Sequence, residues 1–299
     1  NFVHISHQKE KVFDSKVGKV VDKKTDVLIF PRFHQLKVIK MLKESVIEEG
    51  VGNNYLIQHT TGSGKSLSIG WLSHLLSSLY RNTDDTNRMF DSIIVVTDRR
   101  ILDKQIRDTI KQLEQTKGVV NPVDVDSQQL KEYLEVGKTI IVTTVQKFPV
   151  ISESISKLKS KNFGVIIDEV HSSQSGETSK HLKMSLSKSV LDEYQEGEDR
   201  DDLTDYEQKI LTQIISRGKQ NHISYFGFSG TPKNKTLEIF GRKNQNGQFE
   251  SFDTYSMEQS IYEGFTLDVL QNYTTYERYF KLNKKIEEDK ELPSSRVKK

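Results

Sequence analysis

The chain has 299 residues and a formal net charge of +2, with 34% hydrophobic and 29% charged residues. This composition is typical of a globular protein with a charged surface, and the length allows one or two domains with a substantial core. No apolar run approaches the roughly 18 residues of a membrane-spanning helix, and no signal-peptide pattern opens the chain. The absence of cysteine excludes disulfides and cysteine-ligated metal sites, and it fits a cytoplasmic location.

The hydrophobic pattern predicts an α/β fold. Residues 1–25 are rich in lysine and weakly patterned, but apolar residues recur at helical spacing over residues 33–47. Further helical patterns cover residues 65–80 and 101–113. Short apolar runs predict strands at 55–59, 92–97, 139–144, 165–168 and 224–229. Buried strands that alternate with helices favour a mostly parallel sheet with helices on both faces.

The stretch TTGSGKS, residues 60–66, is typical of a phosphate-binding loop because it follows a predicted strand and opens a predicted helix. Gly62 and Gly64 allow the backbone to approach a phosphate, Lys65 can reach the β- and γ-phosphates, and the Ser66 hydroxyl can hold Mg²⁺. The common pattern G-x-x-x-x-G-K-[ST] has glycine where this chain has His59. We interpret His59 as shaping the start of the turn. A purely structural turn is the alternative, which this context disfavours.

Residues 165–171 read VIIDEVH, an apolar strand that ends in two carboxylates. Ligands of open α/β sheets bind at the carboxyl ends of the strands. We therefore expect Asp168 to hold Mg²⁺ and Glu169 to orient or deprotonate the attacking water. A solvated strand end would explain this pair equally well if the phosphate-binding loop were absent.

Several segments together resemble the first RecA-like lobe, a P-loop ATPase lobe, of superfamily 2 helicases and translocases. The most specific likeness is to the motor region of the restriction subunit of type I restriction-modification enzymes. The segments are TTGSGKS (60–66), VVTDRRILDKQ (95–105), IVTTVQKF (141–148), DEVH (168–171) and FSGTP (228–232). In addition, FPRFHQ (30–35) resembles an adenine-recognition motif, and YSMEQSIYEGFTLDVL (255–270) resembles the segment that leads out of the lobe.

The resemblance implies a role for each motif. ATP and Mg²⁺ are the implied cofactors. Gln35 would bond the adenine edge with Arg32 or Phe33 against the ring, and the phosphate loop would comprise Thr61, Gly62, Ser63, Gly64, Lys65 and Ser66. Contacts to the DNA backbone, or support of the contacting loops, would come from Asp98, Arg99, Arg100, Thr143, Thr144 and Lys147. Coupling between nucleotide state and lobe movement would involve His171, Ser229, Gly230, Thr231 and Pro232.

Some of these residues have simpler interpretations. Gln35 could be a surface glutamine at a helix start, Arg99 and Arg100 could lie in a solvated loop, and Thr143 and Thr144 could simply end a strand. The segment 192–207, with nine acidic residues and one basic residue, is more typical of a solvated loop or exposed helix than of a contact with a basic partner.

The resemblance also implies a domain organisation. Residues 1–27 would be a linker from an upstream nuclease domain, 28–275 the motor lobe, and 276–299 the start of the connection to a second lobe. That second lobe would supply arginines that stabilise the transition state, so we expect little ATP turnover from this chain alone. No nuclease motif of the form D…E-x-K is evident in the sequence.

The implied partners are double-stranded DNA and the methylation and specificity subunits of a restriction-modification complex, with no membrane. Another superfamily 2 helicase or a remodeller-type translocase is one alternative. A nucleotide-gated binding module without turnover is another.

Overall fold

The structure is a computed structural model that describes residues 2–14, 19–82, 84–97, 100–114, 116–123, 127–168 and 205–268. The chain divides into two compact units, Asn1–Ser256 and Met257–Lys299. The first unit contains the predicted sheet and its helices, and the second begins with α10 (Met257–Tyr262).

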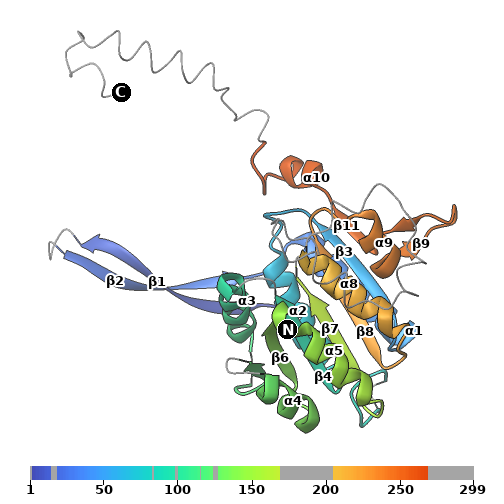
Figure 1. The fold of residues 1–299 in the computed structure, drawn as a ribbon. Helices are drawn as coiled ribbons and strands as arrows, with labels where there is room; N and C mark the ends of the chain where they lie inside the picture. The colour runs from blue at the N-terminus through green and yellow to red at the C-terminus, as the bar shows by residue number, and fades with distance from the viewer. Residues whose placement is uncertain are drawn as a thin grey trace. The chain divides into compact units, whose positions relative to one another are not determined.

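A seven-stranded sheet forms the centre of the first unit, with strand order β11-β3-β8-β7-β4-β6-β5 (Figure 1). Every neighbouring pair in it is parallel, so all carboxyl ends lie at one edge. The bounds are β3 Asn54–His59, β4 Ser92–Thr97, β5 Val120–Pro122, β6 Ile140–Thr144, β7 Phe163–Ile167, β8 Ile223–Ser229 and β11 Asp253–Tyr255. The predicted α/β fold with a mostly parallel sheet is thereby confirmed, and the five predicted strands are present. Strands β5 and β11, of three residues each, were not predicted.

Helices cover both faces of the sheet, which explains why the strands are apolar along their whole length. Along β4, Ile93 and Val95 belong to one core cluster and Ile94 and Val96 to another, as the two-residue period of a strand requires. The first cluster includes residues of α1 (Phe33–Glu49), α2 (Lys65–Ser77) and α3 (Arg100–Gln112). The second includes residues of α4 (Ser127–Val136), α5 (Phe148–Lys157), α8 (Asp205–Arg217) and α9 (Asn234–Phe240).

The first residues form a β-hairpin, which the weak pattern of this region did not predict. Strand β1 (His4–Asp14) pairs antiparallel with β2 (Lys19–Ile29), from His4 opposite Ile29 to Asp14 opposite Lys19. Phe2 and Ile29 pack against the first core cluster. A second, short hairpin joins β9 (Arg242–Lys243) to β10 (Phe249–Glu250). Within the described residues, no helix combines the length and apolar character needed to cross a membrane.

Candidate nucleotide-binding site

The predicted phosphate-binding loop lies at the carboxyl edge of the sheet, between the end of β3 at His59 and the start of α2 at Lys65. Gly62 and Gly64 have φ angles of 83° and 84°, a left-handed conformation that side chains other than glycine rarely adopt. The first turn of α2 directs backbone N–H groups and the positive end of the helix dipole toward the loop. The predicted strand–turn–helix arrangement is therefore present, with glycine at the two positions where the turn requires it.

The lysine of the loop is held inside it. The Lys65 residue is only 8% exposed, and its Nζ donates a hydrogen bond to the carbonyl oxygen of His59 at 3.3 Å. Ser63 is buried, and its Oγ has no hydrogen-bond partner in the part of the chain that the structure describes. Thr61 and Gly62 are exposed at the tip of the loop, and Ser66 is half-buried. A buried ammonium group at the head of a helix can neutralise the charge of a bound phosphate.

Helix α1 supports the loop through Gln35, which is 1% exposed. Gln35 accepts a hydrogen bond from the Arg32 backbone N–H at 2.8 Å, as in a capping box. Its Nε2 donates to the carbonyl oxygens of Ser63 at 3.3 Å and Gly64 at 3.0 Å. Gln35 is thus a buried part of the loop's support, not a surface glutamine. Its predicted bond to adenine stays a prediction, and making it would require these contacts to rearrange.

The two residues predicted to lie against the adenine ring differ in exposure. Arg32 is half-buried, and its guanidinium donates to the Gly62 carbonyl oxygen at 3.5 Å. Phe33 is 77% exposed in the first turn of α1, between Arg32 and Gln35, which both contact the loop. Phe33 therefore offers the larger free apolar surface for a base.

Asp168 directly follows β7 and is 6% exposed, and its backbone N–H donates to the Val96 carbonyl oxygen at 3.0 Å. One strand, β8, separates β7 from β3, so the ends of β3 and β7 lie about 10 Å apart. Ser229, the last residue of β8, is buried between them, and it stands opposite Gln58 of β3. Gly230 and Thr231 follow at the same edge, and Thr231 is exposed. Glu169 and His171 lie outside the described residues.

The residues present fit a magnesium ion. Mg²⁺ prefers oxygen ligands and is commonly held by one or two carboxylates together with substrate phosphates. The Ser66 hydroxyl and the Asp168 carboxyl are oxygen donors at the same edge of the sheet. In the described part of the chain, no group of three or more His, Asp or Glu side chains forms a cage that would bind a metal ion without a substrate.

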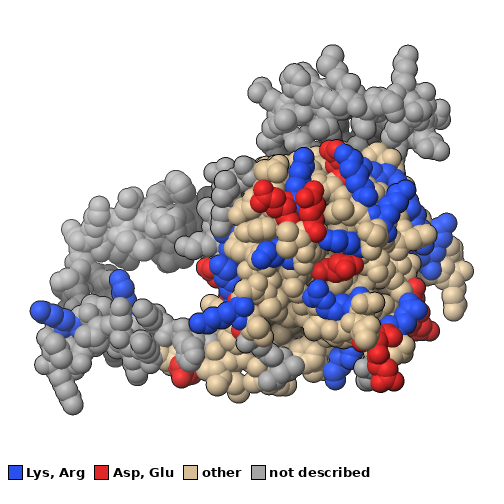
Figure 2. Space-filling model, turned by 90° about the horizontal axis from the view of Figure 1, so that it is seen from below, with Lys and Arg blue, Asp and Glu red and all other residues tan. Residues whose placement is uncertain are grey.

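The residues predicted to face DNA lie at the ends of β4 and β6. Thr143 is 1% exposed, whereas Thr144 and Lys147 are half-buried, and Lys147 Nζ donates to the Val123 carbonyl oxygen at 3.1 Å. Arg100 is the first residue of α3, whereas Asp98 and Arg99 lie outside the described residues. On the face shown in Figure 2, the basic and acidic side chains of the described residues are interspersed. The basic side chains on this face therefore do not form a continuous patch that would indicate where DNA binds.

The structure shows a cluster of polar side chains beneath the loop, buried except for Lys37, that the sequence pattern did not predict. We call it the loop-support cluster: His34, Lys37, His59, Asp253 and Tyr255. Asp253 Oδ2 lies 2.9 Å from His59 Nε2, and Asp253 Oδ1 accepts from Lys37 Nζ at 2.7 Å. His34 stacks on Tyr255, with ring centroids 3.7 Å apart, and its Nε2 lies 2.9 Å from the Ser63 carbonyl oxygen. The one sequence signal for this cluster was the histidine at a position where glycine is usual.

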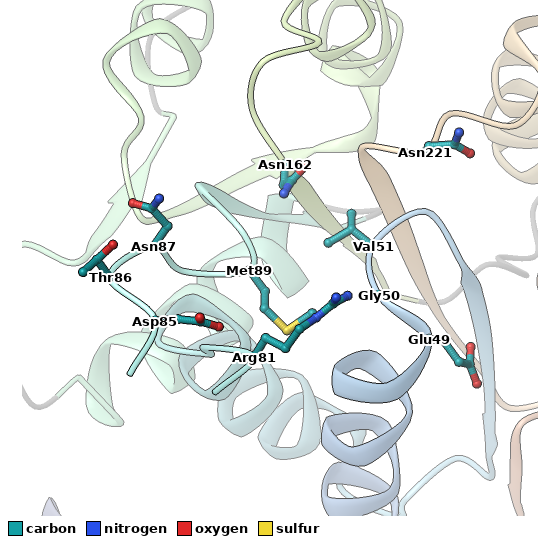
Figure 3. Close-up of a pocket in the computed structure, with 10 residues that line it drawn as sticks. All are labelled: Glu49, Gly50, Val51, Arg81, Asp85, Thr86, Asn87, Met89, Asn162 and Asn221. Carbon is teal, nitrogen blue, oxygen red and sulfur yellow. The ribbon is translucent and has the colours of Figure 1, made fainter. Parts of the chain in front are cut away.

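A separate hollow of about 520 Å³ lies at the opposite edge of the sheet (Figure 3). It is lined by segments that precede β3, β4, β7 and β8, including Gly50, Asp85, Asn162 and Asn221. In Figure 3 the Arg81 side chain extends toward Gly50 from the neighbouring segment. Parallel α/β sheets bind ligands at the carboxyl edge, so the loop is the stronger candidate site.

Comparison with known proteins finds relatives among the subunits of type I restriction enzymes. The chain is 26% identical over 85% of its length to the endonuclease subunit of a type I restriction enzyme from Staphylococcus saprophyticus, of which it covers 23%. It is 25% identical over 85% of its length to the corresponding subunit from Staphylococcus aureus strain COL, again covering 23%. The chain thus spans about a quarter of the length of these curated relatives.

Among solved structures, a nuclease-deletion mutant of the type ISP restriction-modification enzyme LlaGI, in complex with a DNA substrate mimic, matches with a TM-score of 0.47 and 12% identity. The match covers 80% of this chain and 21% of that chain. A family profile described as SWI2/SNF2 ATPase matches residues 34–191, which is more than half of the chain. The matched range begins in α1 and includes the phosphate-binding loop and Asp168. The chain therefore belongs to the SWI2/SNF2 ATPase family.

Proposed function

We propose that this chain is the ATP-binding motor lobe of a double-stranded-DNA translocase, the restriction subunit of a type I restriction-modification complex. ATP hydrolysis in that complex would drive DNA translocation before cleavage. The observation that carries the proposal is the geometry of the phosphate-binding loop. Lys65 heads α2 behind two left-handed glycines, and Asp168 ends β7 at the same edge of the sheet.

In the proposed mechanism, the loop binds the phosphates of ATP. The left-handed glycines keep side chains away from the phosphates, and Lys65 exchanges its bond to the His59 carbonyl for a phosphate oxygen. Ser66 and Asp168 would hold Mg²⁺, which when bound neutralises charge on the phosphates. Glu169 would orient or deprotonate the attacking water. The adenine would lie against Phe33 or Arg32, with Gln35 at its edge.

The remaining motifs would link hydrolysis to movement on DNA. Arg99, Arg100, Thr144 and Lys147 would contact the DNA backbone, which suits tracking that does not depend on sequence. Because the Thr143 side chain is buried, we assign it to supporting the contacting loop. His171, Ser229, Gly230 and Thr231 would transmit the nucleotide state to a second lobe. Methylation and specificity subunits would complete the complex in the cytoplasm.

The decisive experiment uses the complete protein purified with its partner subunits. ATP is added to a linear duplex that carries a bound third strand, and displacement of the third strand is followed. A forked duplex in a parallel reaction tests strand separation. We expect displacement without strand separation, lost in Lys65→Ala and retained in Lys157→Ala, which removes a lysine from an exposed pair on α5. Strand separation, or a response to RNA alone, would overturn the proposal in favour of another superfamily 2 helicase.

A further inference from the structure

Strand β11 lies beside β3 at the edge of the sheet and contacts the start of the phosphate-binding loop. Tyr255 stands opposite His59 in the register, and the Tyr255 carbonyl oxygen accepts a hydrogen bond from the Thr60 backbone N–H at 3.0 Å. Asp253 and Tyr255 are buried and Thr254 is exposed, so β11 presents two side chains to the loop-support cluster. The last residue of β11 is two positions before the second unit begins at Met257.

The Asp253 carboxylate joins β3 to α1. It accepts a hydrogen bond from His59 at one oxygen and from Lys37 at the other. Burial alone would raise the pKa of Asp253, but the hydrogen bonds from His59 and Lys37 outweigh it and hold that pKa below its ordinary value. Because an ionised carboxylate only accepts hydrogen bonds, the His59 proton is assigned to Nε2. Among the described residues, the buried His59 Nδ1 has no hydrogen-bond partner, so the hydrogen bond that holds the side chain is the one with Asp253.

His59 in turn touches the catalytic lysine through its backbone. Its carbonyl oxygen accepts the hydrogen bond from Lys65 Nζ, at a distance of 3.3 Å that is long for such a bond. A contact of this length is easily exchanged for a phosphate oxygen. The His59 side chain is hydrogen-bonded to Asp253 of β11, while its carbonyl oxygen accepts from Lys65, the group proposed to bind phosphate. A glycine at position 59 would keep the backbone pairing with β11 and the carbonyl contact with Lys65, but it would lose the side-chain hydrogen bond to Asp253.

We propose that Asp253 is a positioning residue for nucleotide binding. It fixes His59, whose carbonyl oxygen orients Lys65, and so links phosphate occupancy of the loop to β11 and the chain that follows it. This inference rests on the proposed function, because it takes ATP as the ligand of the loop. Burying a carboxylate is costly unless it is hydrogen-bonded, and here His59 and Lys37 each donate to one oxygen of Asp253.

The test measures Mg-ATP affinity of the 299-residue chain by fluorescence, with hydrogen exchange of residues 253–256 as a second measurement. Asp253→Asn preserves the shape of the side chain and removes its charge. Its matched control, Glu153→Gln, removes a carboxylate from an exposed pair on α5. We expect Asp253→Asn to raise Kd about tenfold, the loss of one charge-assisted hydrogen bond. We expect Glu153→Gln to leave Kd unchanged.

A double-mutant cycle separates positioning from general destabilisation. If Asp253 acts through Lys65, then Asp253→Asn weakens binding far less in a Lys65→Ala background than in the wild type. ATP should also slow hydrogen exchange at residues 253–256 in the wild type, but not in Asp253→Asn. Equal losses in both backgrounds, or an unchanged exchange response in Asp253→Asn, would overturn the inference. A wild-type chain that fails to bind Mg-ATP would overturn the proposed function as well.

Discussion

The sharpest structural prediction concerns Gly64→Ala, because two separate costs meet at this residue. Gly64 has a φ of 84°, and an added Cβ would lie 2.6 Å from Gln35 Nε2. The left-handed backbone costs an alanine about 1–2 kcal/mol. Moving the Gln35 amide away also breaks its hydrogen bonds to the Ser63 and Gly64 carbonyls, at about 1 kcal/mol each. The expected loss in the free energy of unfolding is therefore about 3–4 kcal/mol.

Gly118→Ala is the matched control for this substitution. Gly118 has a φ of 91°, but an added Cβ there would have no atom of the described residues within 4 Å. It should therefore cost only the backbone strain, about 1–2 kcal/mol. Both variants are compared with the wild type by denaturant unfolding, monitored by circular dichroism.

A third variant isolates the contact with Gln35. In a Gln35→Ala background the amide is absent, so Gly64→Ala should cost no more than Gly118→Ala does. The coupling free energy from this cycle should be about 2 kcal/mol. Additive costs, or equal costs for Gly64→Ala and Gly118→Ala in the wild type, would refute the reasoning that Gln35 supports the loop.

Three further predictions follow from neighbouring contacts. Because the folded-state pKa of Asp253 is lowered, its carboxylate stabilises the fold above about pH 4. The difference in unfolding free energy between wild type and Asp253→Asn should therefore close as pH falls below that value. A difference that stays constant with pH in urea unfolding would contradict this. The Arg242 guanidinium donates to both carboxylate oxygens of Glu49 at 2.7 and 2.8 Å and lies 4.7 Å from the Tyr55 ring centroid. Because lysine cannot make this two-pronged contact, Arg242→Lys should lower the free energy of unfolding by about 1 kcal/mol. An unchanged unfolding midpoint would argue against a stabilising role for Arg242. Because Phe33 is exposed, Phe33→Ala should change the free energy of unfolding by no more than about 0.5 kcal/mol. It should weaken ATP binding severalfold if the adenine stacks on this ring. An unchanged Kd for ATP would exclude Phe33 as the residue against which the adenine lies.

The sheet could be predicted because burial on both faces makes each long strand a continuous apolar run. Residues 92–97, SIIVVT, are buried at every position, and the predicted and observed bounds of this strand agree. Strand β11 has only three residues, and its pairing with β3 depends on a segment almost 200 positions away, which no local pattern shows. The hairpin of residues 4–29 escaped prediction because lysines interrupt the alternation of its strands.

The site was predictable where a local turn forms it and hidden where distant segments meet. The glycines of the loop, with Lys65 and Ser66, follow from the short stretch TTGSGKS alone. The support beneath the loop does not, because Asp253 reaches His59 across 194 positions of sequence. Departures from a local rule tend to occur at functional sites. His59 in place of glycine is such a departure, and its partner explains it.

The loop-support cluster also explains how so short a strand holds its place. Strand β11 pairs with β3 at three positions and lies at the edge of the sheet, so its backbone bonds to a single neighbour. Its side chains add contacts that the backbone lacks: Asp253 bonds to β3 and α1, and Tyr255 stacks on His34 of α1. Two of these partners also contact the phosphate-binding loop: His34 lies against the Ser63 carbonyl oxygen, and the His59 carbonyl oxygen accepts from Lys65. Under the proposed function, we therefore expect a nucleotide that orders the loop also to stabilise β11, because His34 and His59 each contact both.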